Sequence, residues 1–344
     1  MLMDSTITFY LDKQLHDIVM SDKERFHFKG NKSILFRTII LNHYPSYSNE
    51  KSFLKDIVKN EIIGIDNSVN FSDIDYANIA WQIAKKIDSA SIFQKAKQKN
   101  KEKVNIRNGS FNQDISFILN SVPSDVTQTE YLGDIIKSYC SKPQYEREQI
   151  IFKEAFQNIN LALENSQQIT IKYVSNSDPE PRMRTIHPKL LTTSSEKLFN
   201  YLLYKVDDGK QAPYASSIHL YNVIRVNAEA KSCYFEDEIE KTFERMLING
   251  PQFSIRDNTI YKIHLSSKGI NLFKQSYLER PHPMDISKPE EGIFYFDCSK
   301  LQFENYFGPF YKEMTVLEPI EYAKEYTENL ESVFLKQKDI LTHK

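Results

Sequence analysis

A short alternating run constrains the fold of this chain more than any other feature. In residues 169–173 the apolar side chains of Ile169, Ile171 and Tyr173 alternate with polar ones, which is the period of a strand with one buried face. Further extended stretches are predicted at 182–186, where the strand should end near Pro188, at 199–206 and at 218–226. Short strands at close spacing, separated by turn-forming residues, indicate a small β-barrel or sandwich.

This stretch resembles the WYL domain, an Sm/SH3-like β-barrel of prokaryotic regulators and CRISPR-associated proteins. The resemblance rests on residues 169–173, 184–191, 199–203 and 218–226. The family's name tripeptide is here Asn200–Tyr201–Leu202, and the closing strand lacks the arginines usual in the family. The resemblance implies that nucleic acid or a ligand would bind at the basic and aromatic barrel residues, which are Arg182, Arg184, His187, Lys189, Tyr201, His219, Tyr221 and Arg225.

The N-terminal part of the chain contains a repeated pattern. Residues 6–11 alternate strictly, and two amphipathic helices follow, the first predicted to be capped by Asp12 and the second by Asn31 or Ser33. A second strand with Val104 and Ile106, again followed by two helices, occurs about a hundred residues later. Both copies resemble the ribbon-helix-helix unit of DNA-binding proteins.

Each ribbon strand has unpaired backbone groups and needs an antiparallel partner. The two copies can pair with each other in one chain, or each can pair with its equivalent in another subunit. In either arrangement alternate side chains point outward. From the sequence we expect an outer face with a single charge, made by Thr6, Thr8, Tyr10, Asn105 and Arg107.

A basic run precedes the second strand. It consists of Lys95, Lys97, Lys99, Lys101 and Lys103, with Arg107 just beyond and only Glu102 to offset them. The run is interpreted either as a solvated helix end or as a surface that contacts phosphates. The helices before it are predicted to include a capping box at Ser72 and Asp75 and a core position at Trp81.

The C-terminal part alternates helices and strands and resembles the α/β extension, of ferredoxin-like type, that accompanies WYL domains. In that family the extension often mediates dimerisation. The aromatic density between Phe294 and Tyr311 leads us to expect a homodimer held by this part of the chain.

The sequence therefore predicts a multidomain α+β protein. The predicted domains are a first ribbon-helix-helix-like unit (1–45), a helical connector (46–101), a second such unit with a further helix (102–165), the barrel (166–232) and the C-terminal extension (233–344). This order resembles the WYL accessory proteins of type VI-D CRISPR–Cas systems. Those proteins are described as dimers that bind single-stranded RNA and enhance the RNA-targeting effector nuclease.

Composition limits the other classes of function. The net charge of −2 means that nucleic-acid binding needs a local patch, and the three cysteines are isolated, as expected for a reducing cytoplasm. The chain has no Walker loop, no HExxH, no GxSxG and no CxxC pair. We therefore expect no enzymatic activity, no cofactor, no metal and no membrane span.

Three hypotheses for function remain. The first is a non-catalytic accessory protein that binds single-stranded RNA, with DNA as an alternative partner, and enhances a type VI-D effector. The second is a transcriptional regulator that reads duplex DNA through the ribbon and senses a ligand at the barrel. The third is a protein–protein scaffold.

The basic run yields a first testable prediction. Changing Lys97, Lys99, Lys101 and Lys103 to Ala should weaken RNA binding on every sequence, because phosphate contacts carry no base information. Each lost contact should lower the slope of log affinity against log salt by roughly 0.7 for a single strand. An unchanged slope in filter binding over a salt series would show that the run is a solvated surface.

Overall fold

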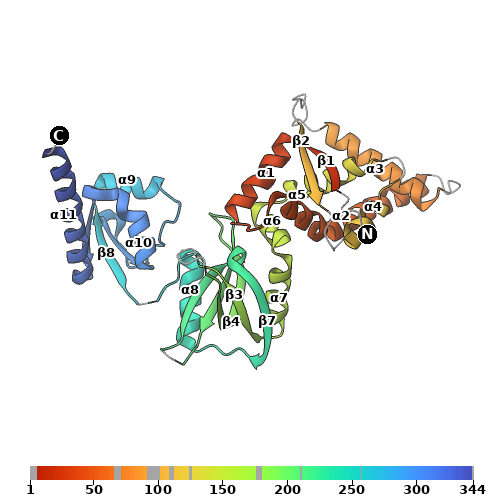
Figure 1. Ribbon diagram of the computed structural model, residues 1–344. Helices are drawn as coiled ribbons and strands as arrows, with labels where there is room; N and C mark the ends of the chain where they lie inside the picture. Colours follow the sequence, from red (N-terminus) through yellow and green to blue (C-terminus); the bar gives the residue numbers. More distant parts are fainter. Residues whose placement is uncertain are drawn as a thin grey trace. The chain divides into compact units, whose positions relative to one another are not determined.

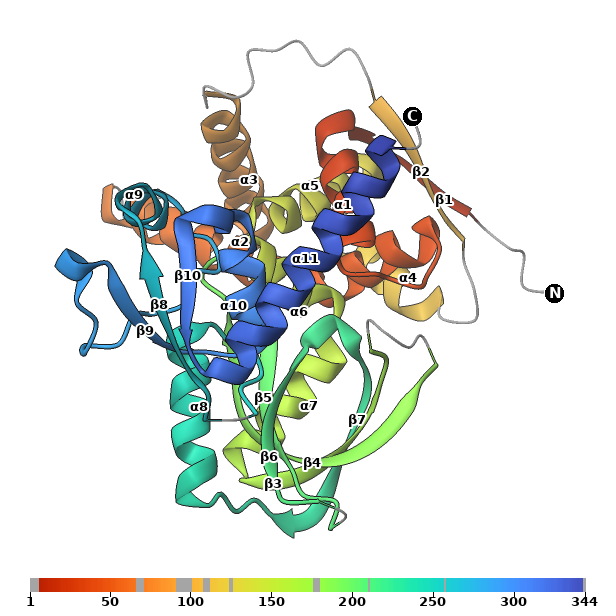
Figure 2. The same cartoon turned by 90° about the vertical axis from the view of Figure 1, so that its left-hand side faces the viewer.

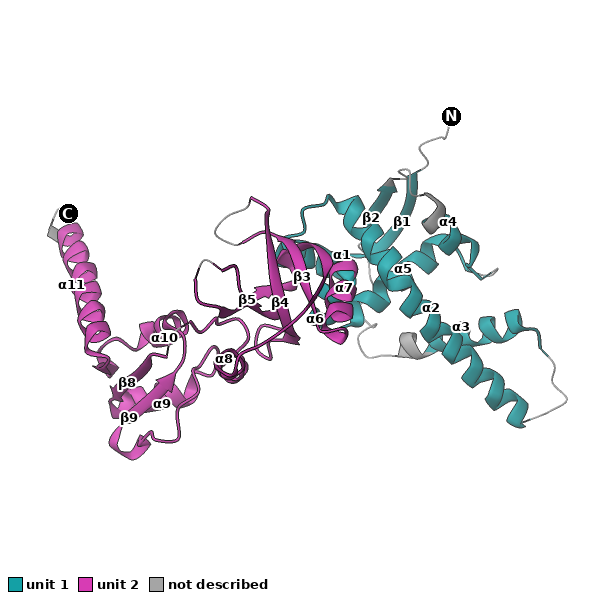
Figure 3. Cartoon of the chain, turned by 90° about the horizontal axis from the view of Figure 1, so that it is seen from below, with its two compact units in different colours: residues 1–153 teal, residues 154–344 magenta. Residues whose placement is uncertain are grey.

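The computed structural model describes residues 6–65, 71–90, 101–107, 112–123, 126–175, 180–209, 211–256 and 258–342. Helices and antiparallel sheets occur in separate layers, which confirms the predicted α+β class (Figure 1). The chain divides into two compact units, residues 1–153 and residues 154–344 (Figure 3). Each unit is described by itself.

A two-stranded ribbon organises the first unit. Strand β1 (Thr6–Asp12) pairs antiparallel with β2 (Lys101–Arg107), from Thr6 opposite Arg107 to Asp12 opposite Lys101. The two repeats thus satisfy each other's backbone groups within one chain. Of the two arrangements that the sequence allowed, pairing within one chain is the one observed.

The inner face of the ribbon packs on helices. Phe9, Leu11, Val104 and Ile106 are all buried, as the alternation predicts. The helices of this unit are α1 (Lys13–Arg25), α2 (Lys32–Ile65), α3 (Asp73–Ala90), α4 (Asn112–Asn120), α5 (Gln128–Ser141) and α6 (Gln144–Ile151). Helix α2 continues through Pro45, so residue 45 lies inside a helix and not at its end.

Helix caps in this unit follow the sequence with one exception. The capping box at Ser72 and Asp75 is present, and Asn31 accepts a hydrogen bond from the backbone of Ile34. The predicted Asp12 cap is wrong, because the side chain of Asp12 makes no capping hydrogen bond. Asp12 is still the last residue of β1, so β1 runs directly into α1.

A buried carboxylate joins three helices of the first unit. Asp22 of α1 is fully buried and accepts hydrogen bonds from the Tyr139 hydroxyl of α5, at 2.7 Å, and from Arg147 of α6, at 2.7 and 3.0 Å. Burial, followed by the nearby Asp22 charge, raises the pKa of Tyr139, so its hydroxyl stays protonated and donates. The carboxylate is therefore paired on two sides, as a buried charge requires.

The second unit starts at residue 154, within helix α7 (Lys153–Glu164). A five-stranded antiparallel sheet follows this helix. Its strand order is β6-β5-β4-β3-β7. The strands are β3 (Gln167–Tyr173), β4 (Arg182–Thr193), β5 (Asn200–Val206), β6 (Tyr214–His219) and β7 (Val223–Ser232). The two outermost strands, β6 and β7, are joined by the three-residue turn Leu220–Asn222, so the sheet curls into an open barrel (Figure 2).

Two predicted strand limits in the barrel are wrong. Strand β4 does not end near Pro188 but continues to Thr193, pairing first with β3 and then with β5. Proline lacks an N–H group, and the register shift between Pro188 and Leu190 accommodates this. The predicted closing strand 218–226 is two strands, because β6 pairs with β5 whereas β7 pairs with β3.

Helix α8 (Asp237–Asn249) covers one part of the barrel. Its residues Ile239, Phe243 and Met246 form a buried cluster with Leu203 and Ala215 of the barrel. The remaining elements form a three-stranded antiparallel sheet in the order β10-β8-β9, with helices beside it. They are β8 (Ile260–Leu265), α9 (Ser267–Gln275), β9 (Ile293–Asp297), α10 (Lys300–Phe307), β10 (Met314–Glu318) and α11 (Ile320–Thr342).

The aromatic residues of this last part form a core. Phe296, Phe303 and Phe307 are completely buried, and Phe294, Tyr306 and Phe310 are at most 6% exposed. The aromatic density from which a dimer interface was predicted is therefore explained by packing within the chain. Tyr311, by contrast, is 67% exposed.

The Asp22 network gives a prediction for stability. Arg147→Ala should lower the free energy of unfolding by about 3 kcal/mol, because it removes the two charge-assisted hydrogen bonds that a guanidinium donates to a fully buried carboxylate. Arg25→Ala is the matched control. Arg25 lies 3.9 Å from the same carboxylate but is 40% exposed, and its loss should cost less than about 1 kcal/mol. Equal losses in urea unfolding would contradict this account.

Candidate nucleic-acid and ligand surfaces

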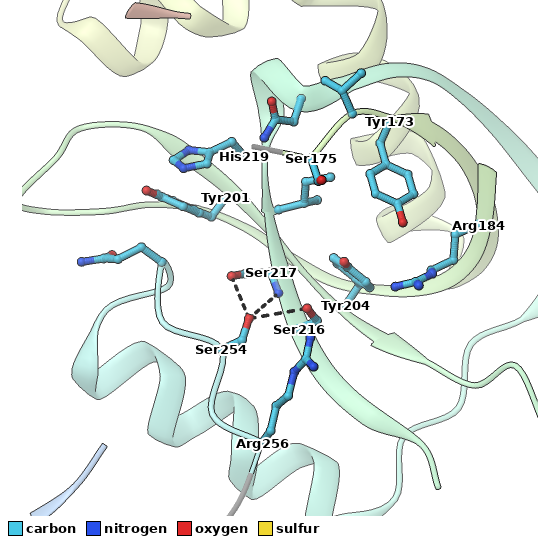
Figure 4. A pocket seen from close by; sticks show the side chains of 14 residues that line it. Tyr173, Ser175, Arg184, Tyr201, Tyr204, Ser216, Ser217, His219, Ser254 and Arg256 are labelled. Atoms are coloured by element: carbon cyan, nitrogen blue, oxygen red, sulfur yellow. Dashed lines mark hydrogen bonds between the residues drawn. The ribbon is translucent and has the colours of Figure 1, made fainter. Parts of the chain in front are cut away.

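The second unit has a cavity at the barrel, with a volume of about 300 Å³ (Figure 4). Residues of β3 to β6 line it on one side, and the segment 250–256, which leads from α8 toward β8, lines it on the other. The lining residues are Tyr173, Val174, Ser175, Arg184, Tyr201, Tyr204, Ser216, Ser217, Ile218, His219, Asn222, Gln252, Ser254 and Arg256.

Aromatic rings form one wall of this cavity. Tyr201 of β5 lies directly opposite His219 of β6 in the antiparallel register, and the two ring centroids are 4.2 Å apart. Behind His219, the ring of Tyr221 stacks at 4.5 Å with an interplanar angle of 27°. Tyr201 is 2% exposed, so it packs in the barrel and lines the cavity at the same time. The wall is therefore aromatic, with the Tyr201 and His219 rings tilted by 41° to each other.

Two arginines form the positive side of the cavity. Arg184 Nη1 donates a hydrogen bond to the Tyr214 hydroxyl at 3.4 Å, and the guanidinium of Arg256 lies 5.1 Å from the centroid of the same tyrosine ring. Burial opposes the charge of Arg184, but the neighbouring hydroxyl groups of Tyr173, Tyr214 and Tyr204 outweigh it and raise the pKa. The guanidinium therefore carries its charge in the cavity.

Among the described residues, no acidic side chain balances the positive charge of these two arginines. No Asp or Glu occurs among the residues that line the cavity, and neither Arg184 nor Arg256 makes an ion pair within the described ranges. Positive charge without a carboxylate, together with an aromatic wall, favours an anionic ligand with a planar ring.

Hydroxyl groups hold the outer segment against the barrel. Ser254 Oγ accepts a hydrogen bond from the Ser217 backbone at 3.2 Å and lies 3.4 and 3.5 Å from the hydroxyls of Ser217 and Ser216 (Figure 4). Sequence reasoning missed Ser254 and Arg256, because both lie well beyond the barrel strands along the chain. No local pattern marks them as site residues.

The other predicted barrel residues lie away from the cavity. Lys189 pairs with Glu240 of α8 at 2.5 Å, and its ammonium lies 5.0 Å from the ring centroid of Phe235. His187 is buried beside the same phenylalanine, and this burial lowers its pKa, so the ring is neutral at pH 7. Arg182 and Arg225 are exposed on β4 and β7 and do not line the cavity. The structure thus brings together Arg184, Tyr201 and His219, with Tyr221 behind them.

The outer face of the ribbon is a second candidate surface. Thr6, Thr8, Tyr10 and Asn105 are exposed there, as predicted, and Thr8 Oγ1 donates to Asn105 Oδ1 at 3.0 Å. The expectation of a single charge on this face is wrong. Lys101 and Lys103 belong to β2 and share the parity of Asn105, so both are exposed on the same face, and Lys103 lies opposite Tyr10.

Part of the predicted basic surface cannot be placed. Lys95, Lys97 and Lys99 lie outside the described residues, and Arg107 is described only by its backbone pairing with Thr6. Within the described ranges, no group of His, Cys, Asp and Glu residues is arranged to hold a metal ion. No helix in the described part of the chain is long and apolar enough to cross a bilayer.

These features define a multidomain α+β protein with a ribbon formed within one chain, an open barrel with a basic aromatic cavity, and a C-terminal α/β sheet. No protein-family model matches the chain, and no curated protein matches it in sequence. Among solved structures, the chain is similar to the crystal structure of a CRISPR Cas-related protein. The TM-score is 0.68 at 20% sequence identity, over 98% of this chain and 96% of that one.

The chain therefore has the fold of that CRISPR Cas-related protein along nearly its whole length, which confirms the predicted resemblance at the level of the fold. A further match is to the proteasome accessory factor PafBC of Arthrobacter aurescens, with a TM-score of 0.27 and 15% identity over 65% of this chain and 38% of that one.

Proposed function

We propose that this protein is a non-catalytic accessory protein that binds single-stranded RNA. The observation that carries the proposal is the barrel cavity, where Arg184 and Arg256 supply positive charge beside the ring wall of Tyr201 and His219. A base placed against the edge of this ring wall, with its phosphate at the guanidinium groups, would use both features. Sequence-tolerant binding of single strands combines base–aromatic stacking with a positively charged surface in this way.

The size of the cavity favours a single strand over a duplex. About 300 Å³ is at the small end of the range for ligand pockets, which fits one nucleotide. A base reaches such a site only when it is unstacked and turned outward, as in single-stranded loops and ends. The ribbon of the first unit, where Tyr10 lies opposite Lys103, offers a separate exposed surface for RNA.

The partner is proposed from the fold. A CRISPR Cas-related protein has a similar fold over 98% of this chain, and the domain order resembles that of the accessory proteins of type VI-D systems. We therefore propose that the RNA-bound protein enhances an RNA-targeting effector nuclease and takes no catalytic part itself.

Binding at the cavity is tested with paired arginine variants. Arg184→Ala combined with Arg256→Ala should weaken binding of single-stranded RNA by about tenfold or more, because charge-assisted hydrogen bonds are worth roughly 1.5–3 kcal/mol. The control is Arg182→Ala with Arg225→Ala, which removes the same charge from exposed barrel positions outside the cavity. Filter binding with single-stranded RNA, single-stranded DNA and duplex DNA measures both. Equal losses in the two double variants would mean that only net charge matters.

A regulator that reads duplex DNA is the second candidate function. The observation that favours it is the completed ribbon, since a two-stranded ribbon with exposed polar side chains fits the major groove. On the proposed function, changing Thr8, Tyr10, Asn105 and Arg107 together to Ala should reduce RNA binding less than loss of the lysine run does. If this quadruple variant instead abolishes sequence-specific duplex binding while RNA binding is unchanged, the regulator hypothesis replaces the RNA hypothesis.

A further inference from the structure

The segment between α8 and β8 presents polar side chains to the barrel cavity. Gln252, Ser254 and Arg256 line the cavity, whereas the intervening residues Phe253 and Ile255 are only 3% and 1% exposed. Ile255 belongs to the buried cluster that α8 forms with the barrel. The buried side chains thus anchor the segment, and the polar ones are available to a ligand.

Contacts along this segment indicate which end of the cavity Gln252 occupies. Arg256 lies beside Tyr214, at the start of β6, and Ser254 accepts a hydrogen bond from the backbone of Ser217, further along the same strand (Figure 4). The segment therefore runs antiparallel to β6, whose last residue belongs to the ring wall. Gln252 accordingly lies toward the ring wall, and Arg256 lies at the other end of the segment.

The amide of Gln252 is not committed to the protein. Its Oε1 is buried and accepts no hydrogen bond from the described residues, and a buried acceptor without a donor costs free energy. A Cβ atom on residue 250 would lie 2.8–2.9 Å from the atoms of this amide, so Gly250 leaves the room that the side chain uses. Because the last torsion of a glutamine is soft, the amide can turn toward the cavity without its oxygen losing a hydrogen bond.

We propose that Gln252 pairs with the Watson–Crick edge of a base in the cavity, an inference that rests on the proposed function. A phosphate at the arginines and a base beside the ring wall would direct that edge toward the amide. An amide offers an acceptor next to a donor, and adenine, cytosine and uracil each carry a donor next to an acceptor on this edge. The amide matches either order by turning, so it accepts all three bases.

What the amide selects is therefore a free base edge. In a duplex the Watson–Crick edge is already paired, so the base cannot meet Gln252. A methyl group on the edge nitrogen removes the donor and fills the space that the amide needs. The cavity should therefore take unpaired, unmethylated bases, and Gln252 is the residue that determines this specificity.

Methylation of the base edge tests the inference in the full-length chain. Wild-type protein should bind a short oligouridine about tenfold more tightly than an oligomer of N3-methyluridine with the same length and charge, because a bidentate pair provides discrimination of this order. Gln252→Ala should bind both oligomers with equal affinity, since it weakens binding of the unmodified one. Filter binding at one salt concentration measures the ratio, and circular dichroism verifies that the variant is folded.

Two controls separate this inference from the proposed function. Gln168→Ala removes a partly buried barrel glutamine outside the cavity, which donates to the Ser232 carbonyl at 3.3 Å, and it should leave the ratio unchanged. Arg184→Ala with Arg256→Ala should weaken binding of both oligomers and keep the ratio, because the phosphate contacts carry no base information.

The possible outcomes are distinct. The inference is overturned if wild-type protein binds RNA but does not distinguish the two oligomers, if Gln252→Ala keeps the full preference, or if Gln168→Ala loses it as well. In each of these cases RNA binding itself, and with it the proposed function, stands. A chain that binds neither oligomer would overturn the proposed function and this inference together.

Discussion

Backbone pairing between β1 and β2 is the constraint on which the first unit depends. An isolated strand leaves its N–H and C=O groups without partners, and neither repeat can supply them alone. Once the two strands pair, Phe9, Leu11, Val104 and Ile106 face one side and form a core with the helices. The same pairing places Tyr10 opposite Lys103 on the other side, so the fold and the candidate surface arise from one register.

In the second unit, the cavity depends on how the chain closes the barrel. The register between β5 and β6 sets Tyr201 opposite His219, and the turn at Leu220–Asn222 brings Tyr221 onto the back of the histidine. The segment after α8 contacts β6 through Ser254, and this contact places Arg256 at the cavity. The family's closing strand usually carries arginines, and here a guanidinium reaches the cavity from a different part of the chain. The positive charge of the cavity therefore comes from Arg184 and Arg256 and not from the closing strand.

The C-terminal unit separates two roles of apolar residues that composition alone cannot distinguish. The aromatic residues from Phe294 to Phe310 lie close together in the sequence, and almost all of them are buried in one core. The apolar residues of α11 are sparser in sequence, yet they are the ones left exposed. Density of aromatic residues therefore indicated a core, whereas the apolar side chains of α11 beyond Tyr326 are exposed.

Local physics made much of this architecture predictable from the sequence. Strict alternation in residues 6–11 and 169–173 identified strands and their buried faces, and the cap at Ser72 follows from a side-chain oxygen that accepts a backbone hydrogen bond. These features depend on residues at most a few positions apart. The α+β class could be predicted on the same basis, whereas the resemblance to a CRISPR-associated protein rests on the order of the domains and on motifs in the barrel and the extension.

Only the tertiary structure decided features that join distant residues. Pairing of β1 with β2 in one chain, the continuation of β4 past Pro188, and the exposure of Lys101 and Lys103 beside Tyr10 all depend on register. The arrival of Arg256 at the cavity and the burial of the C-terminal aromatics depend on packing. Register and packing are set by the total free energy of many contacts between segments far apart in the chain, so no local pattern contains them.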